Sequence, residues 1–248
     1  MRIDVNGIEL FWEETGEGEP LVWLHGGMGS GADWRYLFKD PPAGFRLIAP
    51  DLRGHGASTD PSRAFSFRQC ALDVRALLDH LGIERIKAIG LSGGGIALLH
   101  LATIEPARVA SMVVISAPPY FPGEARAIMQ NFSEATVGEA EMARMHQRHR
   151  RGEAQIRQLF DMARGLADSY DDVSFTPPSL ARITADTLVV FGDRDPLYPV
   201  SLAFELQRAI PRSHLWIVPN GGHGPVFGAA AAPFAATASS FLRGEWHN

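Results

Sequence analysis

A serine lies between small residues at a predicted strand-to-helix turn. The segment Gly90-Leu91-Ser92-Gly93-Gly94 follows an apolar run, Ile86 to Leu91, and precedes a helical pattern that begins near Gly94. A sharp turn of this kind exposes the serine hydroxyl, and small flanking residues let the chain fold tightly. The following helix would direct its positive N-terminal end toward an oxyanion formed there. Because five-residue G-x-S-x-G matches also occur by chance, the prediction of Ser92 as a nucleophile depends on the flanking strand and helix.

A serine nucleophile needs a general base, and His223 is the best candidate. Ester cleavage requires a group that takes the serine proton during attack and returns it afterwards, which a histidine does at neutral pH. His223 ends the segment Gly221-Gly222-His223, which follows the apolar run Leu215 to Val218. A glycine-rich loop after a strand brings a side chain to the carboxyl edge of a sheet, where sites of open α/β folds lie.

Two aspartates compete for the position that orients this histidine. Asp193 and Asp195 both follow the apolar run Leu188 to Phe191. A carboxylate bonded to the second ring nitrogen fixes the tautomer of the histidine and stabilises the imidazolium. The local sequence does not choose between these two residues.

The elements that position these residues alternate along the chain. The sequence opens with a predicted hairpin, Arg2 to Val5 and Ile8 to Glu13, joined by the turn Asn6-Gly7. Further strands are predicted at Leu21 to Leu24, Phe45 to Pro50, Ile86 to Leu91, Met112 to Ser116, Leu188 to Phe191 and Leu215 to Val218. Helical spacing marks Phe67 to Leu81, Gly94 to Thr103, Val200 to Ala209 and Ala229 to Leu242. This alternation predicts the α/β class, with a mostly parallel sheet and helices on both faces.

The segment from Pro118 to Thr184 interrupts the alternation. It lacks a convincing strand, so we predict a core domain of residues 1–117 and 185–248 and a helical cap insertion of residues 118–184 over the site. Helices are expected there because long structureless loops are rare in compact domains. They are predicted at Glu124 to Phe132, Glu139 to Arg150 and Glu153 to Leu166. Met129, Phe132, Phe160 and Met162 either line an acyl pocket or pack within the cap.

Over nearly its whole length, the chain resembles an α/β-hydrolase-fold enzyme. Besides the Ser92 turn, the resemblance rests on His25-Gly26-Gly27, on Asp51 to Ser58, on Gly192 to Pro196 and on Gly221-Gly222-His223. The order Ser, Asp, His also matches that family. The resemblance implies an eight-stranded sheet and favours Asp195 over Asp193 as the third member of the triad.

The resemblance also implies where an oxyanion would be held. The backbone N–H of Gly93, which follows the nucleophile, and that of Gly27 in the His25 loop are the expected donors. Met28 is the alternative to Gly27.

Composition limits the partners that the chain is expected to bind. The formal net charge of -5 provides no basic field for nucleic acid. No apolar run reaches the roughly 18 residues that a membrane span needs, and the N-terminal sequence lacks a signal-peptide pattern. The single cysteine, Cys70, lies in a helical apolar pattern and is expected to be buried. We expect a cytoplasmic enzyme that acts on a small molecule; the sequence does not indicate its oligomeric state.

Other motifs suggest neither a metal nor a cofactor. An H-E-x-x-H spacing is missing, as are G-x-G-x-x-G and the Walker lysine, so none is expected. His25 and His55 lie in turns, where an imidazole bonding to backbone groups is the expected role. The basic run from Met142 to Arg151, with His146 and His149, is expected to be a solvated helix face.

The predicted activity is hydrolysis of a carboxylic ester, or of a related small acyl compound, through an acyl-Ser92 intermediate. This corresponds to the carboxylesterase class, EC 3.1.1. Carbon-carbon bond hydrolysis, cofactor-free perhydrolysis of the haloperoxidase kind, or ligand reception without turnover could use the same fold, because a fold does not determine its function.

Overall fold

The computed structural model describes residues 1–63 and 65–246. Eight strands form one sheet in the order β1-β2-β4-β3-β5-β6-β7-β8. The strands are β1 (Arg2–Val5), β2 (Ile8–Thr15), β3 (Glu19–Leu24), β4 (Phe45–Pro50), β5 (Ile86–Leu91), β6 (Val109–Ile115), β7 (Asp186–Gly192) and β8 (Ser213–Val218). The helices are α1 (Phe67–His80), α2 (Gly93–Ile104), α3 (Gly123–Gln130), α4 (Glu134–Val137), α5 (Glu139–Arg148), α6 (Glu153–Leu166), α7 (Pro177–Leu180), α8 (Val200–Ala209) and α9 (Ala231–Leu242). Short 3-10 helices are η1 (Gly31–Tyr36), η2 (Pro106–Arg108) and η3 (Gly228–Ala230).

The sheet is mostly parallel, as the sequence predicted. β1, β2 and β4 pair antiparallel, and the strands from β4 through β3 to β8 pair in parallel. Asn6 and Gly7 have positive φ angles of 47° and 78°, which a type I′ hairpin turn requires. The prediction of an eight-stranded α/β sheet is confirmed.

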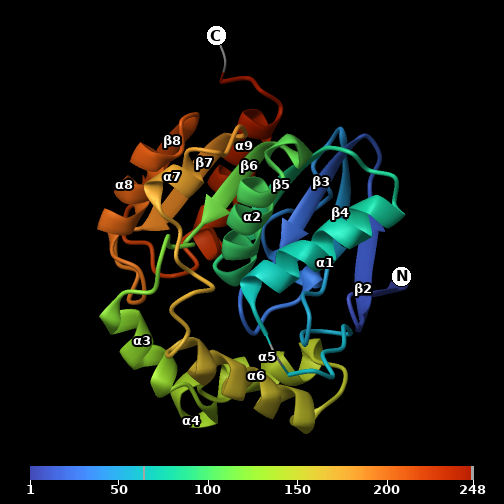
Figure 1. Cartoon of the computed structure of the whole chain (residues 1–248), viewed down its shortest axis with the longest axis vertical. Helices are drawn as coiled ribbons and strands as arrows, with labels where there is room; N and C mark the ends of the chain where they lie inside the picture. Colours follow the sequence, from blue (N-terminus) through green and yellow to red (C-terminus); the bar gives the residue numbers. More distant parts are fainter. Residues whose placement is uncertain (64, 247–248) are drawn as a thin grey trace.

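Apolar side chains of alternating strand positions fill two separate cores. Along β6, Met112 and Val114 pack with α1, α2 and α8, whereas Val113 and Ile115 pack with η1 and α9 on the opposite face. This period of two is that of a strand buried on both faces. Figure 1 shows α1 and α2 in front of the sheet and α9 behind it.

The predicted elements agree with the observed ones to within a few residues at their ends. Two four-residue helices, α4 and α7, were not predicted, because so few residues cannot show a helical repeat. α7 packs against α8 and α2 of the core.

Helices α3 to α6 lie together at the end of the sheet where β3, β5 and β6 terminate (Figure 1). The chain enters and leaves this layer through two adjacent extended segments, which form an antiparallel bridge between Tyr120 and Ser174. Met145, Ile156 and Phe160 of this layer form a small apolar cluster that also includes Met28 from the loop after β3. The division of the chain at residues 118 and 184 remains a prediction.

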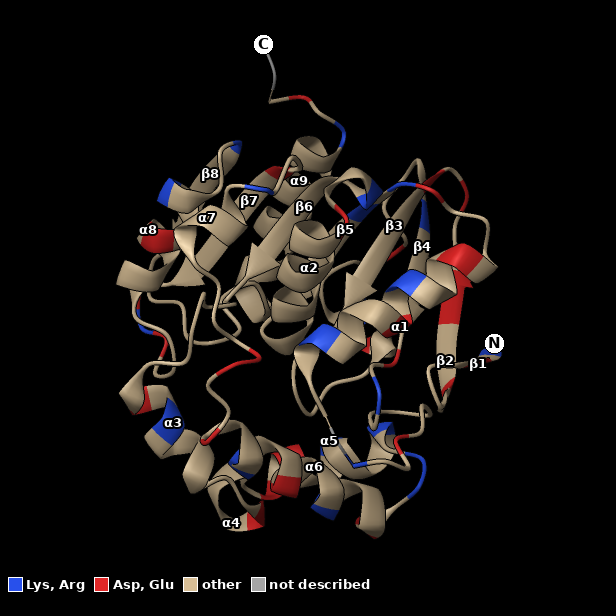
Figure 2. Ribbon diagram, viewed as in Figure 1, with Lys and Arg blue, Asp and Glu red and all other residues tan. Residues whose placement is uncertain are grey.

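Two central elements of the fold lack Lys, Arg, Asp and Glu. Figure 2 shows acidic and basic residues interspersed over the outer elements, whereas β6 and α2 carry none. Within the described residues, no helix is long and apolar enough to cross a membrane.

Candidate active site

Ser92 occupies a tight turn between β5 and α2. Its φ of 48° and ψ of −115° lie in a region that residues with a side chain rarely adopt. The turn is possible because two glycines allow close backbone contact. A Cβ atom added to Gly90 would lie 2.7 Å from the carbonyl oxygen of Gly94, and one added to Gly94 would lie 2.2 Å from that of Leu24. The G-x-S-x-G pattern is therefore a steric requirement of this turn.

The structure brings Ser92, His223 and Asp195 together from three loops. His223 Nε2 lies 2.9 Å from Ser92 Oγ, and His223 Nδ1 lies 2.9 Å from Asp195 Oδ2. Nδ1 faces a carboxylate, so it carries the ring proton and leaves Nε2 to accept the hydroxyl proton of the serine. The arrangement can therefore deprotonate Ser92 during attack on an electrophilic carbon.

The two aspartates of the β7 loop have different partners. The Asp195 carboxylate is fully buried, and its Oδ1 accepts backbone N–H bonds from Leu197 at 2.8 Å and Tyr198 at 3.2 Å. Asp193 instead accepts a hydrogen bond from Gly221 N at 3.1 Å and so joins its loop to the histidine loop. The structure therefore places Asp195, rather than Asp193, against the histidine.

Backbone N–H groups gather beside Ser92 at the start of α2. The first N–H groups of a helix have no partner within it, and Gly93 is the first residue of α2. A Cβ atom added to Gly93 would lie 3.6 Å from Gly27 N, so the two predicted oxyanion donors are neighbours. Met28 borders the same space, with a positive φ of 61°. Their role as oxyanion donors stays a prediction.

A cavity of about 150 Å³, here called the central cavity, opens from Ser92 and His223 toward α3 and α6. Its walls are almost entirely apolar. They comprise Gly27, Met28, Leu52, His55, Phe65, Phe67, Ser92, Gly93, Ile96, Phe121, Ile128, Met129, Phe132, Met162, Ala163, Leu166, Leu197, Tyr198 and His223. Met129, Phe132 and Met162 thus line the cavity, whereas Phe160 packs inside the α3 to α6 layer.

Tyr198 forms the cavity wall beside the histidine. Its ring meets that of His223 edge to face at 5.2 Å and stacks on Phe121 at 6.2 Å. Burial, and secondarily the nearby Asp195 charge, raise the pKa of Tyr198 well above its ordinary value. The phenol therefore stays neutral and packs against the imidazole.

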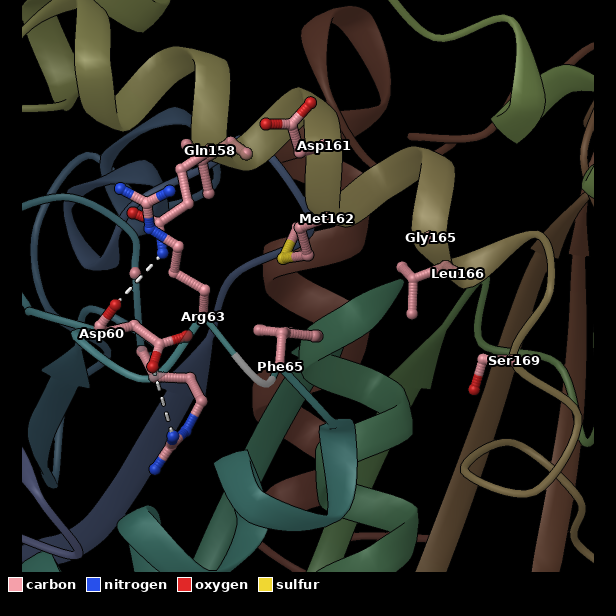
Figure 3. Close-up of a pocket in the computed structure, with 12 residues that line it drawn as sticks. Asp60, Arg63, Phe65, Gln158, Asp161, Met162, Gly165, Leu166 and Ser169 are labelled. Atoms are coloured by element: carbon pink, nitrogen blue, oxygen red, sulfur yellow. Dashed lines mark hydrogen bonds and ion pairs between the residues drawn. The ribbon is translucent and has the colours of Figure 1, made fainter.

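A second hollow of about 310 Å³, here called the side pocket, adjoins the central cavity (Figure 3). Phe65, Met162 and Leu166 line both spaces. Figure 3 shows Met162 and Leu166 directed from α6 toward the loop that carries Asp60 and Phe65. Asp60 bridges this loop to α6, because its carbonyl oxygen accepts a hydrogen bond from Gln158 Nε2 at 3.1 Å.

Two buried histidines hold the loops beneath the site. Leu52 N donates to His25 Nε2 at 2.9 Å, so the Nδ1–H of His25 donates to the Gly26 carbonyl at 2.7 Å. His55 Nδ1 contacts the Arg53 carbonyl at 2.9 Å. Burial is the main cause that lowers the pKa of each imidazole to about 3. The expected backbone-binding roles of His25 and His55 are confirmed.

The basic run from Met142 to Arg151 is only partly a solvated helix face. His146 has the expected exposed side chain, but His149 is only 1% exposed, and Arg148 is bound to both Asp33 and Glu141. The solvated-face prediction is wrong for Arg148 because its guanidinium pairs with these two carboxylates, and it is wrong for His149 because α5 ends at Arg148. His149 then turns inward in an extended conformation. The pattern of charges along the sequence does not show that the helix ends at Arg148.

Cys70 is fully buried in α1, as predicted, and burial raises the pKa of its thiol. Across residues 1–63 and 65–246, no group of three or more His, Cys, Asp or Glu side chains is arranged to hold a metal ion.

Comparison with known proteins assigns the family. The alpha/beta hydrolase fold family matches residues 19–145 of the chain. An AB hydrolase superfamily protein from Bacillus subtilis is 29% identical over 89% of this chain and 90% of its own length. A human protein named serine hydrolase BPHL is 29% identical over 90% of this chain and 79% of its own. A solved meta-cleavage product hydrolase of Pseudomonas fluorescens superposes with a TM-score of 0.79 at 22% identity, covering 99% of this chain and 98% of that one. The chain belongs to the alpha/beta hydrolase fold family, and its general functional class is that of a hydrolase.

Proposed function

We propose that this protein hydrolyses carboxylic esters, or related small acyl compounds, through an acyl-Ser92 intermediate. The observation that carries the proposal is the pair of contacts at 2.9 Å that joins Ser92 Oγ to His223 and His223 to Asp195. A serine with this partner is a nucleophile for acyl transfer, and the adjacent backbone N–H groups are donors of the kind that stabilises an oxyanion.

Each step uses groups that are already in contact. Ser92 Oγ bonds to the carbonyl carbon while its proton passes to His223 Nε2, and the carbonyl oxygen becomes an oxyanion facing Gly27 N and Gly93 N. The carbon–oxygen bond to the alcohol then breaks, and the alcohol leaves with the proton from His223. Water repeats the sequence on the acyl-enzyme, giving its proton to His223, and the carboxylic acid departs as Oγ recovers that proton.

The central cavity supports a small, uncharged acyl group. None of the described residues that line it is Asp, Glu, Lys or Arg, so an ionised acyl chain would lose its hydration without gaining a partner. A dry apolar cavity of about 150 Å³ holds a group the size of benzene, about six carbon atoms. Butyrate and hexanoate esters are therefore the substrates of choice.

A pre-steady-state assay with p-nitrophenyl butyrate tests the proposal. We expect a burst of p-nitrophenol that matches the concentration of sites titrated by a fluorophosphonate. Ser92→Ala should remove both the burst and the labelling, with a loss of turnover of about 10⁴-fold to 10⁶-fold and an unchanged circular dichroism spectrum. Full turnover in the Ser92→Ala protein would refute the acyl-Ser92 intermediate.

Carbon-carbon bond hydrolysis is the second candidate function. The side pocket adjoins the central cavity and is lined by Arg63 as well as by Asp60 and Asp161, and Asp60 already pairs with Arg53 at 3.6 Å. Arg63 is the side-pocket group that would receive the carboxylate end of a substrate with an apolar centre. A vinylogous diketone acid of the meta-cleavage kind tests this candidate through loss of its visible absorbance. Turnover of that compound at a higher kcat/KM than that of p-nitrophenyl butyrate would favour it. Cofactor-free perhydrolysis and ligand reception without turnover have no separate structural observation in their favour.

A further inference from the structure

A third hollow shares Gly27 and His223 with the central cavity. This outer pocket, of about 650 Å³, lies between the Gly26 to Gly29 loop, α5 and the segment that follows His223. Gly27 and His223 line both the outer pocket and the central cavity, whereas Ser92 and Gly93 line the central cavity.

This arrangement separates the two halves of an ester. In the tetrahedral intermediate, the leaving oxygen must face His223 Nε2 to receive its proton, and the oxyanion must face Gly27 N and Gly93 N. With the acyl chain in the central cavity beside Ser92, the leaving group extends past His223. We propose that the outer pocket binds the alcohol half of the substrate, and that this alcohol is neutral, bulky and contains a ring. The proposal rests on the proposed ester hydrolysis.

The charged side chains of the outer pocket neutralise one another. Glu141 binds Arg144 at 2.7 Å and Arg148 at 2.8 Å, and Arg148 also binds Asp33 at 3.1 Å. The two positive charges therefore balance the two negative charges. An ionic leaving group would have to compete with the existing ion pairs. This wall favours a neutral alcohol.

Two aromatic rings form the other wall. Tyr36 and Phe227 meet edge to face at 6.5 Å, and Tyr36 is 57% exposed at the rim. Exposed aromatic rings beside a pocket give a flat ligand apolar contact and a phenolic hydrogen-bond partner. The volume of about 650 Å³ is far more than ethanol needs and lies within the range of drug-sized ligand sites.

Esters that share one acyl group test this assignment. Ethyl, 2-naphthyl and choline butyrates form the same butyryl-Ser92 and differ only in the alcohol. Because aromatic contacts contribute about 0.5 to 1.5 kcal/mol, Tyr36→Ala should lower kcat/KM for the 2-naphthyl ester roughly threefold to tenfold and change that for ethyl butyrate less than twofold. Tyr36→Phe is the matched control and should retain most of the wild-type value.

The deacylation rate separates the alcohol-binding proposal from the proposed ester hydrolysis on which it rests. Tyr36→Ala should leave the deacylation rate of butyryl-Ser92 unchanged, because the alcohol has already departed. Equal losses for the ethyl and naphthyl esters, slower deacylation in Tyr36→Ala, or wild-type preference for choline butyrate would each overturn the assignment. Failure of ester hydrolysis itself would instead appear as a missing burst with every ester.

His149 provides an independent inference about the Gly27–Met28 loop. The Gly56 N–H donates to His149 Nδ1 at 3.1 Å, so the ring proton lies on Nε2 and is donated to the Met28 carbonyl at 3.2 Å. Burial lowers the pKa of His149 to about 3, so this tautomer is neutral at physiological pH. We infer that His149 is a positioning residue that anchors the Met28 carbonyl and thereby orients the Gly27 N–H toward the oxyanion.

Two variants of His149 test the anchoring role. His149→Leu removes the donor, and His149→Gln restores an N–H that can reach the Met28 carbonyl. We expect His149→Leu to lower kcat by about tenfold to a hundredfold with little change in KM, because an oxyanion donor acts on the transition state. Its affinity for a trifluoromethyl ketone should fall by a similar factor, and His149→Gln should recover part of both losses.

Active-site titration keeps this test independent of folding. The measured rate is divided by the concentration of sites that a fluorophosphonate labels. Unfolded protein therefore does not lower the value of kcat. A titrated His149→Leu enzyme with wild-type kcat and inhibitor affinity would overturn the inference. So would equal losses of kcat in the Gln and Leu variants.

Discussion

Asp195 holds His223 with one carboxylate oxygen and the chain that follows β7 with the other. Oδ2 lies 2.9 Å from His223 Nδ1, while Oδ1 accepts the N–H groups of Leu197 and Tyr198. These backbone bonds fix the direction of the carboxylate before any substrate binds. The histidine is therefore preorganised by a carboxylate that backbone N–H groups hold in place.

Replacement of the two loop aspartates should have unequal effects. Asp195→Asn should lower kcat by about 10⁴, because the amide no longer holds the productive tautomer of His223. Asp193→Asn keeps an oxygen that can accept the Gly221 N–H and should lower kcat less than about tenfold. Steady-state kinetics with p-nitrophenyl butyrate measure both values. A larger loss in Asp193→Asn than in Asp195→Asn would show that the assignment is reversed.

Gly94, the glycine after Gly93, should be important for stability. Gly94→Ala would place its methyl group 2.2 Å from the Leu24 carbonyl oxygen, so we expect a loss of about 1 to 3 kcal/mol in the free energy of unfolding. Gly165 in α6 is the matched control, because a Cβ there meets nothing within 4 Å. Gly165→Ala should add about 0.5 to 1 kcal/mol through helix propensity. Urea unfolding would contradict the steric argument if both variants were equally stable.

The buried histidines should make stability depend on pH. Burial lowers the pKa of His25, His55 and His149 to about 3, below the unfolded value of about 6.5. Between these values the unfolded chain binds more protons than the folded one, so the histidine contribution to stability is complete above about pH 6.5 and is lost as pH falls toward 3. Each imidazole contributes a slope of about 1.4 kcal/mol per pH unit.

Single substitutions measure the contribution of one histidine to the pH dependence of stability. Burial raises the pKa of Asp33 and Asp51, which partly offsets the total slope, so each variant is compared with the wild-type protein. The free energy of unfolding is measured with urea at several values between about pH 7.5 and about pH 5. In the lower part of this range, its dependence on pH should be weaker in His149→Gln than in the wild-type protein by about 1.4 kcal/mol per pH unit. His146→Gln, at an exposed position, should keep the wild-type slope. Identical slopes in all three proteins would refute the role of His149.

The length of the acyl chain should be limited by the central cavity. Along p-nitrophenyl esters of rising length, kcat/KM should increase about threefold to fourfold per methylene until about six carbons fill the cavity, and then fall. Met129→Ala removes part of the wall and should move the optimum to longer chains. Met142 packs in the α3 to α6 layer outside the cavity, so Met142→Ala should keep the wild-type optimum. A shift with Met142→Ala alone would place the acyl group elsewhere.

The sequence by itself determined the class of fold and the main candidate residues. Alternating apolar runs and helical spacing are local patterns, so β5, α2 and the turn between them were predictable from adjacent residues. Gly90 and Gly94 also mark this turn in the sequence, since Gly90 permits a close contact within the turn and Gly94 permits one with β3.

Only the tertiary structure decided which distant groups meet. Asp193 and Asp195 are two residues apart, and the path of the loop, fixed by backbone bonds from Gly221, Leu197 and Tyr198, directs one of them to the histidine. The contact of His149 with Met28 spans 121 positions. Local sequence patterns describe only near neighbours, so neither this anchor nor the outer pocket beside His223 could be predicted before the chain was folded.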